Sequence, residues 1–164
     1  MTKENNILIY GYGNPGREDD GLGPALIDLV EEWIIQGKNK NVHIDSNYQL
    51  NIEDAFNIRD YDVVIFADAS VRDIEDFKIT RVEPSDKIHY SMHAVSPSFI
   101  VHLCKKMYNH APDTYLLHIK GYTFNLGEGI SNKASKNLHL AFNFIKEVLS
   151  ESEESVKKLA DWSI

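Results

Sequence analysis

The chain has 164 residues, the size of a single domain, and 43% of them are hydrophobic, which excludes wholesale disorder. Its net charge is −8, so binding to nucleic acid would require a local basic stripe, and only short basic patches such as Lys105-Lys106 occur. One cysteine excludes an intrachain disulfide, and no apolar stretch reaches about 18 residues. We recognise no secretion signal and expect a cytoplasmic protein that spans no membrane.

Apolar periodicity predicts two strands and two helices in the first part of the chain. Pro24 suits the first turn of a helix and Gly37 suits its end, while Asn51 suits a helix cap. The expected elements are a strand at Ile7–Tyr10, a helix from Leu22 to Gly37, a strand at Val42–Asp45 and a short helix from Asn51 to Ile58.

The second part of the chain predicts three strands and two helices. Ser96 caps a helix with Pro97 in its first position. The expected elements are strands at Asp62–Ala67, Phe77–Val82 and Thr114–Lys120, and helices from Pro97 to about Tyr108 and from Asn132 to Leu149. The first two of these strands are about nine residues apart, too close for a helical crossover, so we expect them to pair antiparallel.

This order of elements predicts an α/β fold, a three-layer α/β/α sandwich with a mostly parallel twisted sheet of about five strands flanked by helices. We expect one domain over residues 1–149, with 150–164 as a tail or helix extension. Ligands in such sheets lie beyond the carboxyl ends of the strands. Three segments meet at that edge in this prediction: 11–22, 68–72 and the stretch that leads to Ser96.

The stretch "GYGNPGREDDGLGP" at 11–24 raises the question of nucleotide binding. Gly11, Gly13 and Gly16 have the GxGxxG spacing, and these glycines allow a sharp turn after the first strand. However, the acidic run Glu18–Asp20 would repel a phosphate, no Lys-Ser/Thr pair follows, and Asp45 is the one candidate for a ribose contact. Nucleotide binding is therefore the weaker alternative.

A second interpretation takes the acids as contacts to a metal ion. Asp20, Asp68 and His93 all fall at the predicted ligand edge, and carboxylates with an imidazole suit a divalent transition metal. Each has a simpler role of its own: Asp20 near a helix N-terminus, Asp68 in a turn and His93 in a loop. Their gathering at one edge is what favours the metal site, and both interpretations stay open at this point.

Other residues with reactive side chains favour structural roles. A mid-helix cysteine is usually packing, and a serine nucleophile would need a sharp strand-to-helix elbow. Histidines on a helix or in a strand are retained only as supporting groups. The residues in question are Cys104, Ser70, Ser91, Ser96, His102 and His118.

Three segments resemble the hydrogenase maturation endopeptidases, which trim the large subunit of nickel-iron hydrogenases. They are "ILIYGYGNPGREDDGLGP", "VVIFADAS" and "YSMHAVSP", and the resemblance spans roughly residues 6–149. The family pattern is Gly-x-Gly-Asn followed by Asp-[Asp/Glu]-Gly-x-Gly. The resemblance implies that Asp20, Asp68 and His93 bind nickel, although "SMHAVSP" has a different order from the commoner Ser-Pro-His.

The resemblance also implies a reaction. The nickel arrives already bound to the precursor of the large subunit, and the enzyme removes a C-terminal extension from that precursor. We expect a monomer in which Asp20, Asp68 and His93 recognise the metal and position the scissile peptide. The metal would polarise the carbonyl and activate water, and a carboxylate such as Asp20 would act as general base.

Two other functions are kept as alternatives. "GNPG" also resembles the opening of bacterial peptidyl-tRNA hydrolases, but that family continues with a Thr-Arg-His-Asn segment, and here Arg17–Gly23 contains no histidine. The acidic chain also lacks the basic surface that a tRNA substrate needs. A metal- or nucleotide-binding module without protease activity is the other alternative.

Overall fold

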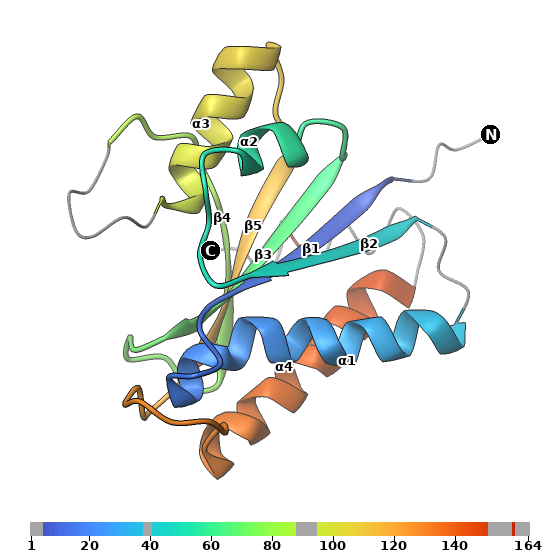
Figure 1. Cartoon of the computed structure of the whole chain (residues 1–164). Helices are drawn as coiled ribbons and strands as arrows, with labels where there is room; N and C mark the ends of the chain where they lie inside the picture. Colours follow the sequence, from blue (N-terminus) through green and yellow to red (C-terminus); the bar gives the residue numbers. More distant parts are fainter. Residues whose placement is uncertain (1–4, 38–40, 88–94, 151–158, 160–164) are drawn as a thin grey trace.

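A mostly parallel five-stranded sheet forms the centre of the molecule (Figure 1). The structure is a computed structural model, and it describes residues 5–37, 41–87, 95–150 and 159. The spatial order is β2–β1–β3–β5–β4, with β4 antiparallel to β5 and the other neighbours parallel. The strands are β1 (Ile7–Tyr12), β2 (Val42–Asn47), β3 (Val63–Ser70), β4 (Phe77–Arg81) and β5 (Asp113–Lys120).

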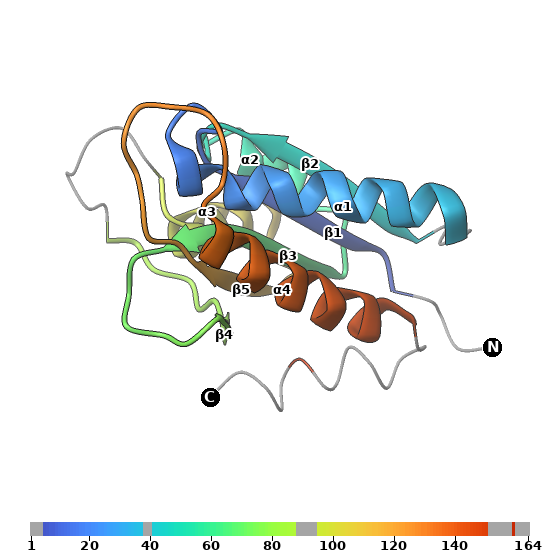
Figure 2. The same cartoon turned by 90° about the horizontal axis from the view of Figure 1, so that it is seen from below.

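Helices cover both faces of this sheet (Figures 1 and 2). A short 3-10 helix, η1, joins β1 to α1. The long helices α1 and α4 pack on one face, and α2 and α3 pack on the other. The three-layer sandwich expected from the order of elements is therefore confirmed. The helices are η1 (Glu18–Gly21), α1 (Leu22–Gly37), α2 (Asp54–Asn57), α3 (Pro97–Tyr108) and α4 (Asn132–Ser150).

Alternate residues of the central strands feed two separate apolar cores. Ile7 and Ile9 of β1 enter the core that α1 and α4 close, whereas Leu8 and Tyr10 enter the core that α2 and α3 close. Because both faces of the strand are covered, both sets of side chains must be apolar, and the strand appears in the sequence as a continuous apolar run. The same reasoning holds for β3.

The edge strand β4 corrects one prediction. We expected the strands now labelled β3 and β4 to form an antiparallel pair. Their opposite directions are confirmed, because β4 is antiparallel to β5 and β5 is parallel to β3, but β5 lies between them and pairs with both. The connection at 71–76 needs to span only two strand spacings, roughly 10 Å, which a loop of this length does easily. The long-range parallel pairing of two buried strands therefore takes the place of a local hairpin.

The start of α2 corrects a second prediction. We expected Asn51 to cap this helix, but the helix begins at Asp54 and its N-cap residue, Glu53, makes no side-chain cap hydrogen bond. Instead the amide of Asn51 donates to Asp54 Oδ2 at 2.8 Å. A capping Asn51 would accept a hydrogen bond with its side chain, but here its backbone amide is the donor. The acceptor is the carboxylate of Asp54, which is part of the helix.

The beginning of α3 confirms its prediction. Ser96 is the N-cap, its Oγ accepts a hydrogen bond from the amide of Phe99 at 3.2 Å, and Pro97 is the first helical residue. The helix ends at Asn109, which adopts a left-handed φ of 63°. The local signals were therefore sufficient to define both ends of this helix.

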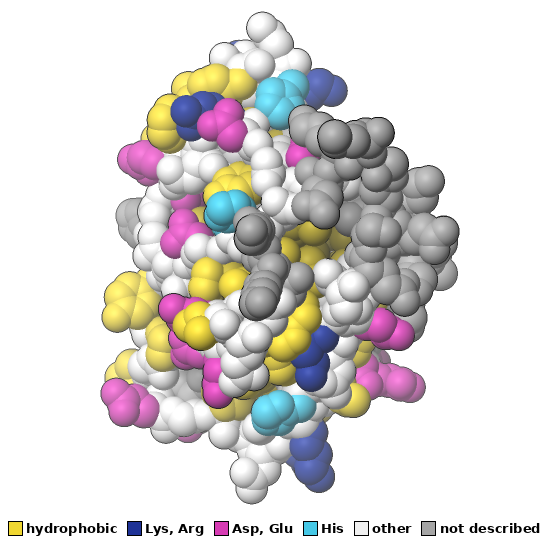
Figure 3. All heavy atoms as spheres, turned by 90° about the vertical axis from the view of Figure 1, so that its right-hand side faces the viewer, with side chains coloured by type: hydrophobic (Ala, Val, Ile, Leu, Met, Phe, Trp, Pro, Cys, Tyr) yellow, Lys and Arg dark blue, Asp and Glu magenta, His cyan; other side chains and the backbone are white. Residues whose placement is uncertain are grey.

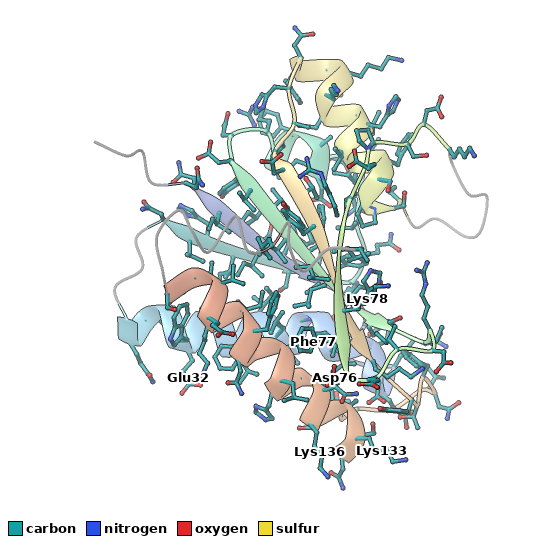
Figure 4. All side chains as sticks on the ribbon, turned by 180° about the vertical axis from the view of Figure 1, so that it is seen from behind. Glu32, Asp76, Phe77, Lys78, Lys133 and Lys136 are labelled. Carbon is teal, nitrogen blue, oxygen red and sulfur yellow. The ribbon has the colours of Figure 1, made fainter. Side chains whose placement is uncertain are left out.

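The C-terminal part of the chain closes the core below the sheet. Phe77 of β4, labelled in Figure 4, lies on the side of the sheet that α4 covers. Its ring centroid is 5.2 Å from that of Phe144 of α4. Leu159 is fully buried in the same core. The other residues after 150 lie outside the described residues, so the division into a domain of 1–149 and a tail of 150–164 stays a prediction.

Side chains of both charge signs share the surface. On the face that lies on the right of Figure 1, the described Lys and Arg side chains stand apart from one another among acidic and polar groups (Figure 3). This face therefore offers no continuous basic stripe among its described side chains. Within the described ranges, no helix has the length and apolarity that crossing a membrane requires.

Candidate active site

Two of the three predicted site residues come together at the carboxyl edge of the sheet. Asp20 lies in η1, which follows β1 after the glycine-rich turn at 13–17, and Asp68 lies near the end of the neighbouring strand β3. Burial, and next the negative charge of Asp20, raise the pKa of Asp68 to about 7. The two carboxylates therefore interact. The third predicted residue, His93, lies outside the described residues.

Asp20 is held in place by the glycine-rich turn. The amide of Asn14 donates to Asp20 Oδ2 at 2.8 Å, and the amide of Asp20 donates to the carbonyl of Arg17 at 3.2 Å. Gly13 has a φ of 140°, and a Cβ at this residue would collide with the carbonyl oxygen of Asp20. Glycine at 13 is therefore needed for the sharp turn that brings Asp20 to the sheet edge.

Asp68 lies inside β3 and not in the turn that follows it. The hydroxyl of Tyr12 and the amide of Ala69 are donor groups beside its carboxylate. They favour the ionised form, but burial and the charge of Asp20 outweigh them and keep the pKa high. Asp68 is therefore part-protonated at neutral pH, because burial and the negative charge of Asp20 both oppose its ionised form.

Asp68 belongs to a row of polar side chains that crosses the sheet on the face covered by α3. Tyr12 of β1 is beside Asp68, because the parallel ladder pairs Gly11 with Ala67, and His118 of β5 pairs with Asp68 in register. Sequence reasoning considered His118 as a supporting group and missed Tyr12. The position of Tyr12, two residues after Tyr10 and so on the same face of the strand, could have indicated that it lies on this face.

The histidine in this row is neutral at neutral pH. Burial, and then the positive charges of Arg72 and Lys78, lower the pKa of His118 to about 4. Its Nε2 lies 2.9 Å from Oγ1 of Thr80 on β4. The expectation that His118 lies in the fifth strand is confirmed, and its neutral ring next to Asp68 adds no charge to the carboxylate pair.

Asp19, adjacent to Asp20 in sequence, has an entirely different environment. Its side chain is fully buried and ties η1 to the segment after β5. Its Oδ2 accepts from the amides of Tyr122 and Thr123 and from Oγ of Ser131, at 2.8, 3.1 and 2.8 Å, and its Oδ1 accepts from the amide of Ser131 at 2.7 Å. Burial alone would raise the pKa of Asp19, but these hydrogen bonds lower it below 3.8.

The residues before Asp19 fasten the same two segments. The amide of Glu18 donates to the carbonyl of Gly127 at 2.8 Å, and Glu18 Oε2 accepts from the amide of Asn125 at 3.1 Å. A guanidinium nitrogen of Arg17 donates to the carbonyl of Phe124 at 3.2 Å. Two of the three consecutive acids are therefore anchors for loop 122–131, and only Asp20 points to the candidate site.

The remaining candidates have the structural roles that we expected, as far as the described residues test them. Cys104 is buried in the core under α3, and Ser96 is a helix cap. Ser70 is buried and its Oγ accepts from the amide of Arg72 at 3.2 Å. His102 lies on α3, where its ring is 6.1 Å from the ring of Phe99. Ser91 lies outside the described residues.

The donors at this edge suit a hard or borderline divalent cation. A cation near Asp20 and Asp68 would relieve their mutual repulsion and favour the ionised form of Asp68. Among the described residues, no group of three or more His, Cys, Asp or Glu side chains is arranged to hold a metal ion. The site as described therefore supplies two carboxylates, which is an incomplete shell for a tightly bound metal.

Comparison with known proteins identifies the fold. No family model matches the chain, and no curated protein matches it. The structure of the [NiFe] hydrogenase maturation protease HycI from Thermococcus kodakarensis matches with a TM-score of 0.73, over 92% of this chain and 96% of that one, at 21% identity. The chain has the fold of the hydrogenase maturation proteases. The likeness at this identity concerns the fold and not yet the activity.

Further structures with this protease fold agree. The hydrogenase maturating endopeptidase HybD from E. coli matches with a TM-score of 0.71, over 88% of this chain and 92% of that one, at 16% identity. A hydrogenase 2 maturation peptidase from a Thaumarchaeota archaeon matches with a TM-score of 0.63, over 88% and 97%, at 20% identity. The protease fold therefore accounts for nearly the whole chain.

Proposed function

We propose that this protein is an endopeptidase that removes the C-terminal extension from the nickel-loaded large-subunit precursor of a nickel-iron hydrogenase. The observation that carries the proposal is the carboxylate pair, Asp20 and Asp68, at the ligand edge of a sheet with the protease fold. Fold alone would not support an activity, because one fold hosts many functions. The pair adds a site with the chemistry that recognition of a cation needs.

The mechanism that we propose uses the metal of the substrate. The precursor carries nickel to the sheet edge, where Asp20 and Asp68, with His93 as the third group, contact it. A nickel ion held there would supply polarisation of the scissile carbonyl or of the attacking water, and Asp20 is the residue that we propose as general base. The chain's own residues orient the metal-bearing segment and accept the proton from water.

The carboxylate pair also supplies a reason for nickel dependence. Without a cation, Asp20 and Asp68 repel each other, and part of the population holds a proton on Asp68. A precursor without nickel would leave this repulsion in place, whereas a nickel-loaded precursor relieves it. Docking is therefore favoured only after metal insertion, in the cytoplasm where we expect precursor and protease to meet.

Loop 122–131 is the segment that we propose for recognition of the precursor. It follows β5 at the same edge as the carboxylates, and Asp19 and Glu18 fasten it to the segment that carries Asp20. Leu126 in this loop is 86% exposed, so its apolar side chain is accessible to a binding partner. A fixed loop with an exposed leucine suits contact with a polypeptide.

The alternative functions have less support. The three solved structures reported above are maturation proteases, and none of them is a tRNA hydrolase or a nucleotide-binding protein. A phosphate group at the glycine-rich turn would approach Asp20, whose negative charge opposes it. Asp20, one of the acids that argued against a nucleotide site, is therefore part of the site that supports the proposal.

The test uses the purified protein with nickel-loaded and nickel-free precursor in parallel. We expect the nickel-loaded precursor to lose a C-terminal peptide, visible as a mobility shift on a gel and as a mass loss of the large subunit. The nickel-free precursor is expected to remain intact. Equal cleavage of the two precursors would contradict the proposed dependence of cleavage on nickel. If neither precursor is cleaved and the protein binds nickel tightly, a metal-binding module without protease activity is favoured.

A further inference from the structure

Two tyrosines of β1 have matching surroundings. Tyr10 and Tyr12 project to the same face of the sheet, and both rings lie against Phe66, with centroid distances of 5.6 and 6.3 Å. The hydroxyl of Tyr10 donates a hydrogen bond to Oδ2 of Asp54 at 3.1 Å. The side chain of Tyr12 lies beside that of Asp68 on the neighbouring strand, and its hydroxyl acts as a donor group toward the Asp68 carboxylate. The chain thus contains the same arrangement twice, two residues apart.

The two carboxylates differ in what else they contact. Asp54 is buried at the start of α2, where it also accepts from the amide of Asn51 at 2.8 Å and from Nδ2 of Asn57 at 3.1 Å. Its oxygens are therefore occupied by groups of its own turn. Asp68 has the amide of Ala69 and the hydroxyl of Tyr12 as neighbouring donor groups, and the charge of Asp20 acts on it.

A carboxylate in the position of Asp68 needs a partner to keep its orientation. The terminal torsion of aspartate is broad, and repulsion from Asp20 favours rotation of the Asp68 oxygens away from the shared site. The hydroxyl of Tyr12 sits on a ring that Phe66 packs against and that the neighbouring strand backbone fixes beside Asp68. A donor on such a rigid group opposes that rotation.

We propose that Tyr12 is a positioning residue, whose hydroxyl holds the Asp68 carboxylate in the orientation that faces the substrate-borne cation. The part of the proposal that concerns cleavage rests on the proposed function, whereas the orientation of Asp68 does not. Groups that orient a metal-contacting side chain in this way commonly change metal affinity or activity by about 10–100-fold when they are removed.

The experiment compares Tyr12→Phe with Tyr10→Phe, which removes the matched hydroxyl two residues earlier. Both variants keep the aromatic ring, so both keep the packing on Phe66. For each variant and the wild type, the crystal structure gives the orientation of the Asp68 carboxylate, and cleavage of the nickel-loaded precursor gives kcat and KM. The melting temperature completes the comparison.

For Tyr12→Phe we expect a rotated or doubly oriented Asp68 carboxylate and a fall in kcat of about tenfold or more, with a melting temperature close to that of the wild type. For Tyr10→Phe we expect a lower melting temperature, because Asp54 loses a buried donor, with Asp68 and kcat unchanged. A merely structural role of Tyr12 would not lower kcat while leaving the melting temperature unchanged.

An unchanged orientation of Asp68 in Tyr12→Phe overturns the proposal, and so does an equal fall in kcat in Tyr10→Phe. If the wild type leaves every nickel-loaded precursor intact, the proposed function fails. In that case the orientation of Asp68 in the two variants still decides whether Tyr12 positions it.

Discussion

Asp19 and Asp68 are carboxylates at the same edge of the sheet, but their surroundings shift their pKa values in opposite directions. Asp19 receives hydrogen bonds from three backbone amides and a hydroxyl, which stabilise its charge and lower its pKa. Asp68 has fewer donor groups around it and faces Asp20, so burial and the charge of Asp20 raise its pKa to about 7. A carboxylate whose charge is satisfied is a structural anchor, and one whose charge is unsatisfied has room for a ligand.

The largest effect that we expect is on cleavage. Asp68→Asn removes the charge but keeps the shape, and we expect kcat/KM for the nickel-loaded precursor to fall by at least about a hundredfold, as for loss of an acid–base group. The control is Asp60→Asn, an exposed acid on the loop before β3, for which we expect no change. A decrease of equal size in both variants would show that Asp68 has no special role.

The next largest effect is on stability. Asp19→Asn converts an oxygen acceptor into an amide that faces buried donors, and we expect a loss of about 2–4 kcal/mol in the free energy of unfolding at neutral pH. Urea denaturation of the purified variant measures this loss. An unfolding midpoint equal to that of the wild type would mean that the hydrogen bonds of Asp19 do not hold loop 122–131.

The pH dependence of stability separates the two acids further. The pKa of Asp68 rises from 3.8 in the unfolded chain to about 7, so its contribution to stability is present in acid and is lost as the pH rises through the folded pKa. We therefore expect Asp68→Asn to exceed the wild type in stability at about pH 8, on the order of 2 kcal/mol, with the difference gone near about pH 4.

Asp19 has the opposite window. Its pKa is lowered from 3.8, so its contribution is present above that value and is lost as the pH falls through the folded pKa. The loss in the free energy of unfolding caused by Asp19→Asn should therefore become smaller in acid. The stability that the wild type loses through ionisation of Asp68 is also absent at low pH, because Asp68 is then protonated. Chemical denaturation of both variants across the pH range measures these changes. If the stability of the two variants, relative to the wild type, changed with pH in the same direction, the opposite roles of Asp19 and Asp68 would be refuted.

The smallest effect concerns one donor to Asp19. Ser131→Ala keeps the backbone amide but removes the hydroxyl, which lies 2.8 Å from Asp19 Oδ2 and also accepts from the amide of Ala134 at 3.3 Å, and we expect a loss of about 1 kcal/mol. Cleavage should stay near the wild-type value, because Asp20 and Asp68 are untouched. The same denaturation experiment measures the loss, and a loss as large as that of Asp19→Asn would mean that the hydroxyl carries the whole anchor.

Much of the fold could be predicted because its signals are local. The apolar spacing of α1 and the Ser96-Pro97 start of α3 lie within a few neighbouring residues, and the structure agrees with both. The partner of β4 was predicted wrongly, because the insertion of β5 between β3 and β4 depends on a strand more than 30 residues away. Strand order of this kind is decided by packing over the whole sheet.

The candidate site divides in the same way. Asp20 and Asp68 could be predicted, because each follows or ends a recognisable strand and the carboxyl ends of parallel strands meet at one edge. The role of Asp19 could not, since its partners lie more than 100 residues later in loop 122–131. Tyr12 was overlooked because an aromatic residue at a strand end normally indicates packing. Its hydroxyl acquires a role only through its neighbour on β3.

The most direct test of the account is the rate at which Asp20→Ala processes nickel-loaded precursor, measured on a gel beside the wild type. The matched control is Asp28→Ala, which removes an exposed acid on α1. We predict that Asp20→Ala leaves the C-terminal extension in place while Asp28→Ala removes it at the wild-type rate. Removal of the extension by Asp20→Ala at the wild-type rate would contradict the assignment of the carboxylate pair as the active site.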